Sequence, residues 1–254
     1  MIEVKSISKR FEEQVVLKSV SAVFENGRTN LIIGKSGAGK TVLLKCIVGL
    51  LTPDEGSITY DGRDTMSMSK NERLLMRQEI GMLFQSAALF DSMSVLENVM
   101  FPLDMFSNMT YKDRLARARA CLDRVNLIEA QDKLPEEISG GMQKRAAIAR
   151  AIALEPKYLF CDEPNSGLDP QTSLVIDELI HDITKEYGIT TIVNTHDMNS
   201  VMNIGDHILF LAGGKLAWEG DKTQILNTDN ALLNEFLFSS EILRQVKEQA
   251  LGNK

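Results

Sequence analysis

Apolar and polar positions follow two periods along the chain, and the shorter one marks strands. Near the N-terminus, apolar residues recur at the short intervals typical of β-strands, at Ile2, Val4, Ile7, Val20 and Phe24. Asn26-Gly27 then provides the chemistry of a turn. Further short apolar runs predict strands over residues 31–33, 57–60, 80–84, 158–161, 189–194 and 208–211.

The longer period predicts helices between these strands. Apolar residues at helical spacing favour helices over residues 41–50, 72–78, 95–106, 111–125, 141–153 and 171–187. Pro102 is expected to break the third of them. Strands that alternate with helices predict an α/β fold with a mainly parallel sheet. Residues 86–155 carry helices and no strand pattern, so we expect them to form a helical subdomain inserted into that core.

The C-terminal region, residues 223–254, is expected to be a helical extension beyond a main domain of residues 1–222. Its apolar residues recur at roughly helical spacing, at Leu232, Leu233, Phe236, Leu237, Leu243 and Val246. Burying each large apolar side chain is worth about 1.5–3 kcal/mol, so another surface should cover this stripe. Either the chain's own core or a neighbouring subunit could provide it.

Composition and charge exclude several classes of protein. The 254 residues are 44% hydrophobic and 25% charged, which is ordinary for a globular protein. The formal net charge of −7 gives no electrostatic footprint for nucleic acid. No apolar run approaches the ~20 residues that span a bilayer, and no signal-peptide pattern opens the chain, so we expect a soluble, cytosolic protein. The three cysteines are far apart, and we expect them to be buried, reduced thiols.

The strongest chemical signal follows the strand at residues 31–33. The segment Gly34-Lys35-Ser36-Gly37-Ala38-Gly39-Lys40-Thr41 matches G-x-x-x-x-G-K-[ST], the phosphate-binding P-loop. Glycines let the backbone approach a ligand closely, and the N–H groups at a helix start attract anions. Lys40 would contact the β- and γ-phosphates, and the Thr41 hydroxyl would bind Mg²⁺.

Two adjacent carboxylates end the apolar strand at residues 158–161. Asp162 would hold Mg²⁺ through its water shell, and Glu163 would act as general base toward the attacking water. The pattern is that of a Walker B motif. A solvated loop is the alternative, but the upstream P-loop and the following Pro164 favour the catalytic interpretation.

Ser139-Gly140-Gly141 lead directly into a helix and so provide a second anion-binding helix start. Because one nucleotide does not need two such sites, this one would bind the γ-phosphate held by another subunit. An ordinary helix start with Ser139 as N-cap is the alternative.

Four further residues are weak candidates when each is considered alone. Gln85 follows a strand and could reach Mg²⁺ or the attacking water, while His196 could hydrogen-bond the γ-phosphate. Phe11, expected in a turn between two early strands, could stack on adenine or belong to the core. Asp169 lies in a turn before a helix.

Taken in order, these motifs resemble those of ABC-transporter ATPases over residues 1 to about 220. The resemblance implies a RecA-like, mainly parallel core with an N-terminal antiparallel β subdomain and an inserted helical subdomain. It implies an A-loop at Phe11, a Q-loop at Gln85, a signature motif at Ser139, a D-loop at Asp169 and a switch histidine at His196. It also implies two ATP with Mg²⁺ between two head-to-tail copies of the chain, and integral-membrane permease subunits as partners.

Two positions depart from the usual pattern of this family. Met142 stands where most members have Gln, which leaves that side chain's contact near the ribose in doubt. Asn165 occupies a position that is commonly Thr.

Residues 81–91, 95–99 and 101–103, together with Met142, are most similar to the MlaF-like ATPases of MCE-type phospholipid transporters. This resemblance implies an MCE-domain partner, a place at the cytoplasmic face of the bacterial inner membrane, and a C-terminal extension that reaches the neighbouring ATPase. Amino-acid, methionine and lipoprotein systems, and division-type ABC ATPases, remain alternatives. Eight of the 12 methionines lie between residues 66 and 109, where they could form a groove for a permease helix or fill the core.

Overall fold

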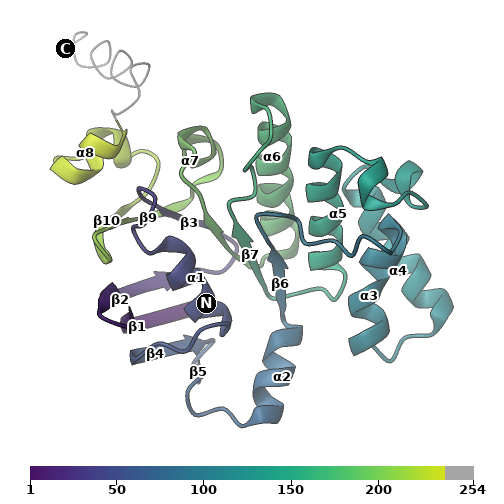
Figure 1. Cartoon of the computed structure of the whole chain (residues 1–254), viewed down its shortest axis with the longest axis horizontal. Coiled ribbons are helices and arrows are strands. Elements are labelled where there is room, and N and C mark those ends of the chain that lie inside the picture. The colour runs from purple at the N-terminus through teal and green to yellow at the C-terminus, as the bar shows by residue number, and fades with distance from the viewer. Residues whose placement is uncertain (238–254) are drawn as a thin grey trace.

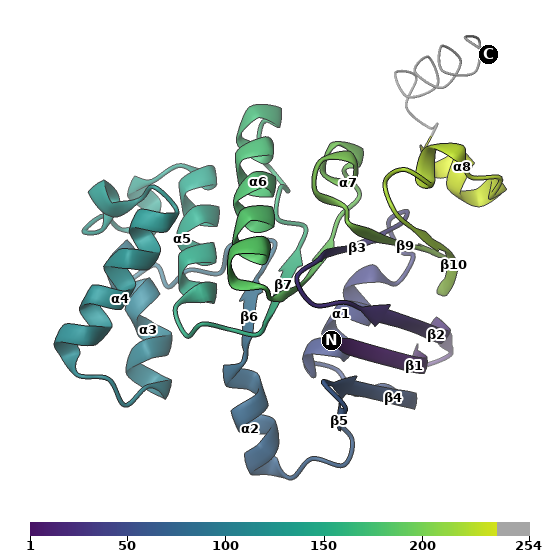
Figure 2. The ribbon, with the colours of Figure 1, turned by 180° about the vertical axis from the view of Figure 1, so that it is seen from behind.

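The computed structural model describes residues 1–237, whose strands form two sheets (Figures 1 and 2). The larger sheet has six strands in the order β10-β9-β3-β8-β7-β6. All of its neighbours are parallel except β9 and β10. Its strands are β3 (Thr29–Ile33), β6 (Ile80–Leu83), β7 (Tyr158–Asp162), β8 (Thr190–Asn194), β9 (His207–Ala212) and β10 (Lys215–Gly220). The predicted α/β fold with a mainly parallel sheet is confirmed.

The central strands of this sheet are buried along their whole length. Every residue of β3, β7 and β8 is buried, as expected for parallel strands covered on both faces. The alternation of a strand is visible in β3, where Leu31 and Ile33 join one hydrophobic cluster and Ile32 joins the other.

The smaller sheet is antiparallel and has the order β2-β1-β4-β5. Its strands are β1 (Ile2–Phe11), β2 (Gln14–Phe24), β4 (Glu55–Tyr60) and β5 (Arg63–Asp64). Phe11 was expected in the turn, but it is the last residue of β1 and pairs with Gln14. Glu12 and Glu13 form the turn instead, because the β1–β2 ladder continues past the apolar positions as far as Phe11.

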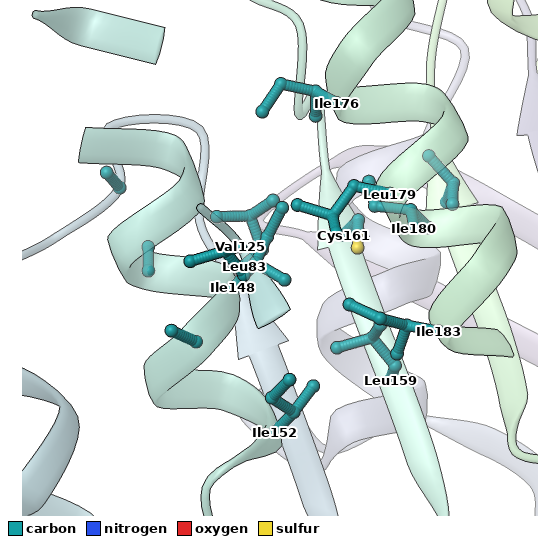
Figure 3. Close-up of a cluster of buried hydrophobic side chains, with 14 of the residues drawn as sticks. Leu83, Val125, Ile148, Ile152, Leu159, Cys161, Ile176, Leu179, Ile180 and Ile183 are labelled. Carbon is teal, nitrogen blue, oxygen red and sulfur yellow. The ribbon is translucent and has the colours of Figure 1, made fainter. Parts of the chain in front are cut away.

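Helices cover both faces of the larger sheet. The helices of the described chain are α1 (Lys40–Val48), α2 (Lys70–Gln78), α3 (Val95–Phe106), α4 (Tyr111–Arg124), α5 (Gly140–Ile152), α6 (Pro170–Tyr187), α7 (Met198–Ile204) and α8 (Ala231–Leu237), of which α3 and α4 pack on α5. Leu43, Leu44 and Ile47 of α1 lie in a cluster shared by the two sheets. On the opposite face, α5 and α6 pack their apolar side chains against β6 and β7 around Cys161 (Figure 3).

Helix α3 contradicts the expectation that Pro102 breaks it, since Pro102 lies inside a continuous helix. A proline inside a helix costs about 3 kcal/mol. Three buried apolar side chains of α3, at Val95, Val99 and Leu103, can each offset about 1.5–3 kcal/mol of that cost. The capping box of Ser94 and Glu97 also fixes the helix start.

Helix α8, the described part of the C-terminal extension, packs on the chain's own core. Leu233 and Leu237 are buried, and the ring of Phe236 lies 5.4 Å from that of Phe210. In this segment, the chain's own core covers Leu233, Phe236 and Leu237 of the apolar stripe, while Leu232 stays 54% exposed. The rest of the predicted tail, including Leu243 and Val246, lies outside the described residues.

The three cysteines are free and buried, which confirms the prediction from their spacing. Burial raises the pKa of the Cys46 thiol to about 11. Within residues 1–237, no helix has both the length and the hydropathy that a membrane crossing requires.

Candidate functional site

The P-loop joins β3 to α1 (Figure 1), and the strand order β3-β8-β7 brings it beside the ends of β8 and β7. Two of its glycines are required by close contacts. A Cβ on Gly34 would lie 2.4 Å from the Leu211 carbonyl oxygen, and one on Gly39 would lie 2.9 Å from the Leu17 side chain. Gly39, at φ 102°, is also in the left-handed region. The loop is therefore shaped as a backbone cradle of the kind that holds phosphate.

Lys40 is almost buried beneath this loop, with 8% of its surface exposed. Its Nζ donates to the Gly34 carbonyl at 2.9 Å and lies 3.9 Å from Glu163 Oε1. Burial lowers the pKa of Lys40, while the charges of Glu163 and Asp162 act to raise it. A buried ammonium with only one carbonyl and a distant carboxylate can accept strong anionic ligands.

Asp162, the last residue of β7, is held by neighbours on two other elements. Thr41 Oγ1 of α1 donates to Asp162 Oδ1 at 3.3 Å, and Asn194 Nδ2 of β8 donates to the same oxygen at 3.1 Å. Asn194 Oδ1 is buried and has no hydrogen-bond partner within residues 1–237. One carboxylate, one hydroxyl and a spare amide oxygen fit a hydrated Mg²⁺, which takes few protein ligands alongside phosphates.

Glu163 directly follows β7 and takes a left-handed backbone conformation at φ 48°. Its Oε2 hydrogen-bonds His196 Nδ1 at 2.7 Å, although 33 positions separate the two residues. Parallel pairing of β7 with β8 explains this meeting, because both residues leave the same edge of the sheet. The structure thus brings Lys40, Asp162, Glu163 and His196 to one place.

The other predicted site residues lie apart from this group. Within residues 1–237, Gln85 hydrogen-bonds neither Thr41 nor Asp162; its Nε2 donates instead to Ser166 Oγ at 3.1 Å. Asp169 caps α6 by accepting from the Thr172 amide at 3.0 Å. The Phe11 ring is 43% exposed, with the Lys9 ammonium 5.6 Å from its centroid.

Ser139 is the N-cap of α5, and its Oγ accepts from the Met142 amide at 3.3 Å. A Cβ on Gly141 would lie 2.5 Å from Thr172 Cγ2, so this helix start packs closely against α6. Helix α5 lies on the opposite face of the larger sheet from the P-loop helix α1, and the two helices are well apart in both views (Figures 1 and 2). The second predicted anion site is therefore away from the chain's own P-loop.

Three functional candidates are missing from the sequence-based predictions. Asn194 is a polar residue at the end of a buried strand. That position in the sequence could have identified it as a candidate site residue. Lys144 is 4% exposed, and its ammonium donates to the Gln85 carbonyl, which connects α5 to the loop after β6. Asn165, predicted only as a departure from the family pattern, hydrogen-bonds both α6 and α7.

Comparisons with known proteins agree on the family. The ABC transporter family model matches residues 17–166. MlaF of Haemophilus influenzae, an intermembrane phospholipid transport system ATP-binding protein, is 38% identical over 93% of this chain and 90% of its own length. MetN of Haemophilus influenzae, a methionine import ATP-binding protein, is 39% identical over 94% of this chain and 71% of its own length. The mkl protein of Mycobacterium leprae, a probable ribonucleotide transport ATP-binding protein, is 36% identical over 93% and 68%.

Solved structures give the same answer. A dimeric ATP-binding cassette bound to ADP and Pi has a TM-score of 0.79 and 33% identity, over 87% of this chain and 99% of that one. Protein cbiO1 of Clostridium perfringens, part of an ABC transporter complex, has a TM-score of 0.83 and 27% identity over 97% and 98%. The site geometry and these similarities lead to one conclusion: the chain belongs to the ABC transporter family, as an ATP-binding subunit that uses ATP with Mg²⁺ and hydrolyses it.

Proposed function

We propose that this chain is the ATPase of an MCE-type transporter and drives phospholipid movement between the inner and outer membranes of a bacterium. The observation that carries this proposal is the similarity to MlaF over nearly the whole of both chains. Met142 in the signature motif and the segment 81–103 support the same branch.

The assembly that we propose is a head-to-tail dimer on separate permease subunits, with an MCE-domain protein as a further partner. It would lie at the cytoplasmic face of the inner membrane. The dimeric state of a related cassette supports the pairing. The N-terminus of α5, capped by Ser139 and followed by Gly140 and Gly141, would bind the γ-phosphate of the partner's ATP. Asp169, at the start of α6, would face the same interface.

In each nucleotide site, the backbone of residues 34–39 and the Lys40 ammonium would hold the phosphates. Thr41 and Asp162 would hold Mg²⁺, which neutralises phosphate charge when it is bound. The exposed ring of Phe11 would stack on adenine. Gln85, bonded to Ser166, would report the position of the helical subdomain to the site.

Glu163 would accept the proton of the attacking water as general base. His196 Nδ1–H would hold the Glu163 carboxylate in place at 2.7 Å. The other ring nitrogen of His196, Nε2, would face the γ-phosphate.

Methionine import is the main alternative within the family, because MetN is as similar in identity as MlaF. Dimer closing on two ATP and reopening after hydrolysis would drive either kind of transport. The two differ in what the permease carries and in which accessory proteins are bound.

Purification of the native complex, with mass spectrometry of its subunits and of its bound lipids, tests the proposal. We expect a permease, an MCE-domain protein and stoichiometric phospholipid. A complex that contains a methionine-binding protein, or a cell-wall regulator and no MCE-domain protein, would refute the lipid-transport role. As a matched readout, phospholipid and methionine can be compared as stimulators of ATP hydrolysis by the purified complex.

A further inference from the structure

The turn formed by residues 163–169 connects the carboxylate of Glu163 to the start of α6. Asn165 lies inside this turn and points its amide toward two helices. Its Nδ2 donates to Asp177 Oδ1 of α6 at 2.8 Å and to Ser200 Oγ of α7 at 3.0 Å. Two donated bonds thus connect the turn to both helices that border it.

The two acceptors are deeply buried, at 1% exposure for Asp177 and 0% for Ser200. Burial raises the pKa of Asp177 to about 6, the charges of Asp197 and Glu178 also raise it, and the hydrogen bonds from Ser200 and Asn165 lower it. At neutral pH the carboxylate is therefore mostly ionised. A buried carboxylate needs such donors, so the contact with Asn165 is costly to break.

Helix α7 begins two residues after His196, so Ser200 and His196 move with the same short segment. The Glu163–His196 contact and the Asn165–Ser200 contact are therefore two bridges between the same two segments. His196 is largely exposed, whereas in the second bridge Asn165 is partly buried and its acceptors, Asp177 and Ser200, are fully buried. The second bridge is therefore better shielded from competing water.

Packing against neighbouring side chains does not fully hold the turn of residues 163–169 in place. A cavity of about 780 Å³ borders it, with Glu163, Asn165 and His196 among its lining residues. Glu163 itself has a left-handed conformation that few non-glycine residues adopt. Such a conformation persists when surrounding contacts fix it, and the amide of Asn165 supplies two of them.

The amide chemistry explains why Asn stands at a position that is commonly Thr. An Asn side chain donates two hydrogen bonds from one nitrogen, while a Thr hydroxyl donates one. Thr at this position could donate to only one of the two helices, and would have to accept from the Ser200 hydroxyl to bond the other. Asn165 can bond both at once.

We propose that Asn165, through Asp177 and Ser200, is a positioning residue that sets the distance between Glu163 and His196 for ATP hydrolysis. The inference rests on the proposed roles of Glu163 and His196. It adds a determinant of turnover that touches neither nucleotide nor metal.

Steady-state ATPase kinetics of the full-length chain in its complex test this inference, with Asn165→Ala, Asn165→Thr and Ser200→Ala. We expect kcat to fall by about tenfold or more in Asn165→Ala, toward the 10²-fold that a displacement of about 1 Å can cost. Asn165→Thr should recover part of the loss because it restores one donor. The KM for ATP should stay within about twofold, since the P-loop is untouched. Ser200→Ala, which removes a single small oxygen, should also lower kcat.

Ser173→Ala is the matched control, because Ser173 is a buried serine of α6 one turn before Asp177 and lies outside this network. It should keep the kcat of the unchanged protein. Circular dichroism at the assay temperature confirms that each variant is folded. A kcat within twofold of the unchanged protein in both Asn165→Ala and Ser200→Ala would overturn the inference, as would equal losses in Asn165→Thr and Asn165→Ala. Glu163→Gln, measured in parallel, separates the two ideas: if it keeps full turnover, the proposed role of Glu163 has failed, whatever the Asn165 variants do.

Discussion

Two opposite charges in the nucleotide site, on Lys40 and Glu163, are 3.9 Å apart and partly shielded from water. Burial lowers the pKa of Lys40, and the nearby Glu163 and Asp162 oppose that change. The facing carboxylates favour the charged form of Lys40 and so counteract the cost of burying its ammonium. The arrangement keeps one positive and two negative groups ready for a polyanion and its metal.

Glu163→Gln is the sharpest test at the scale of a residue. The change keeps the size of the side chain and its bond to His196 but removes its basicity. We expect ATP binding to persist and turnover to fall by about 10²-fold or more, the typical contribution of a general base. Single-turnover hydrolysis and equilibrium ATP binding measure the two effects separately. Lys40→Ala is the companion variant, which should lose ATP affinity as well; turnover of Glu163→Gln within a few-fold of the unchanged protein would contradict the assignment.

At the scale of an element, α8 shows how a short segment is held by a few side chains. It has seven residues, which is too short to be stable alone. Leu233 and Leu237 are buried in the core cluster, and Lys35 of the P-loop forms an exposed ion pair with Glu235 at 2.6 Å. Exposed pairs contribute little, so the apolar contacts fix the helix.

The neighbouring residues Leu233 and Leu232 provide a matched test of this account. Leu233 is fully buried, whereas Leu232 is 54% exposed. Leu233→Ala should lower the free energy of unfolding by about 2–5 kcal/mol, and Leu232→Ala by no more than about 0.5 kcal/mol. Urea unfolding followed by circular dichroism measures both. Equal effects of the two substitutions would show that α8 is not packed on the core in solution.

At the scale of the whole molecule, two helix starts of one chain lie apart, because α1 and α5 are on opposite faces of the larger sheet. One follows the P-loop at Lys40, and the other follows Ser139. If both bind phosphate, as we propose, a single chain holds two half-sites that do not meet within it. Two copies arranged head to tail would complete two such sites.

Mixing two inactive variants tests this arrangement. A Lys40→Ala chain paired with a Ser139→Arg chain should form one site with both lesions and one intact site. We expect the mixture to regain ATPase activity that neither variant has alone, and titration of the ratio should give a maximum near equal amounts. Activity that stays at the level of the separate variants would mean that each site is built within one chain. A mixture in which both chains carry Lys40→Ala is the control.

The sequence by itself predicted the α/β fold, the P-loop and the pair Asp162 and Glu163. These features are local: an apolar strand, a glycine-rich turn and a helix start are written in adjacent residues, and each has its own periodicity. The same locality explains the misses. The weak patterns of α7, with seven residues, and of the edge strand β10 gave no prediction, and packing in α3 outweighed the helix-breaking tendency of Pro102.

Only the tertiary structure decided which side chains meet. Glu163 contacts His196, Asn194 contacts Asp162, and Asn165 contacts Asp177 and Ser200, over separations of 12 to 35 positions. The residues next to each of these positions in the sequence do not indicate which distant side chain it contacts. They follow from the order of the strands, because parallel pairing of β3, β7 and β8 brings their carboxyl ends to one edge of the sheet. The periodicity of apolar residues predicts each strand on its own. The burial of both faces of the sheet decides which strands pair, and this pairing decides which side chains meet at the site.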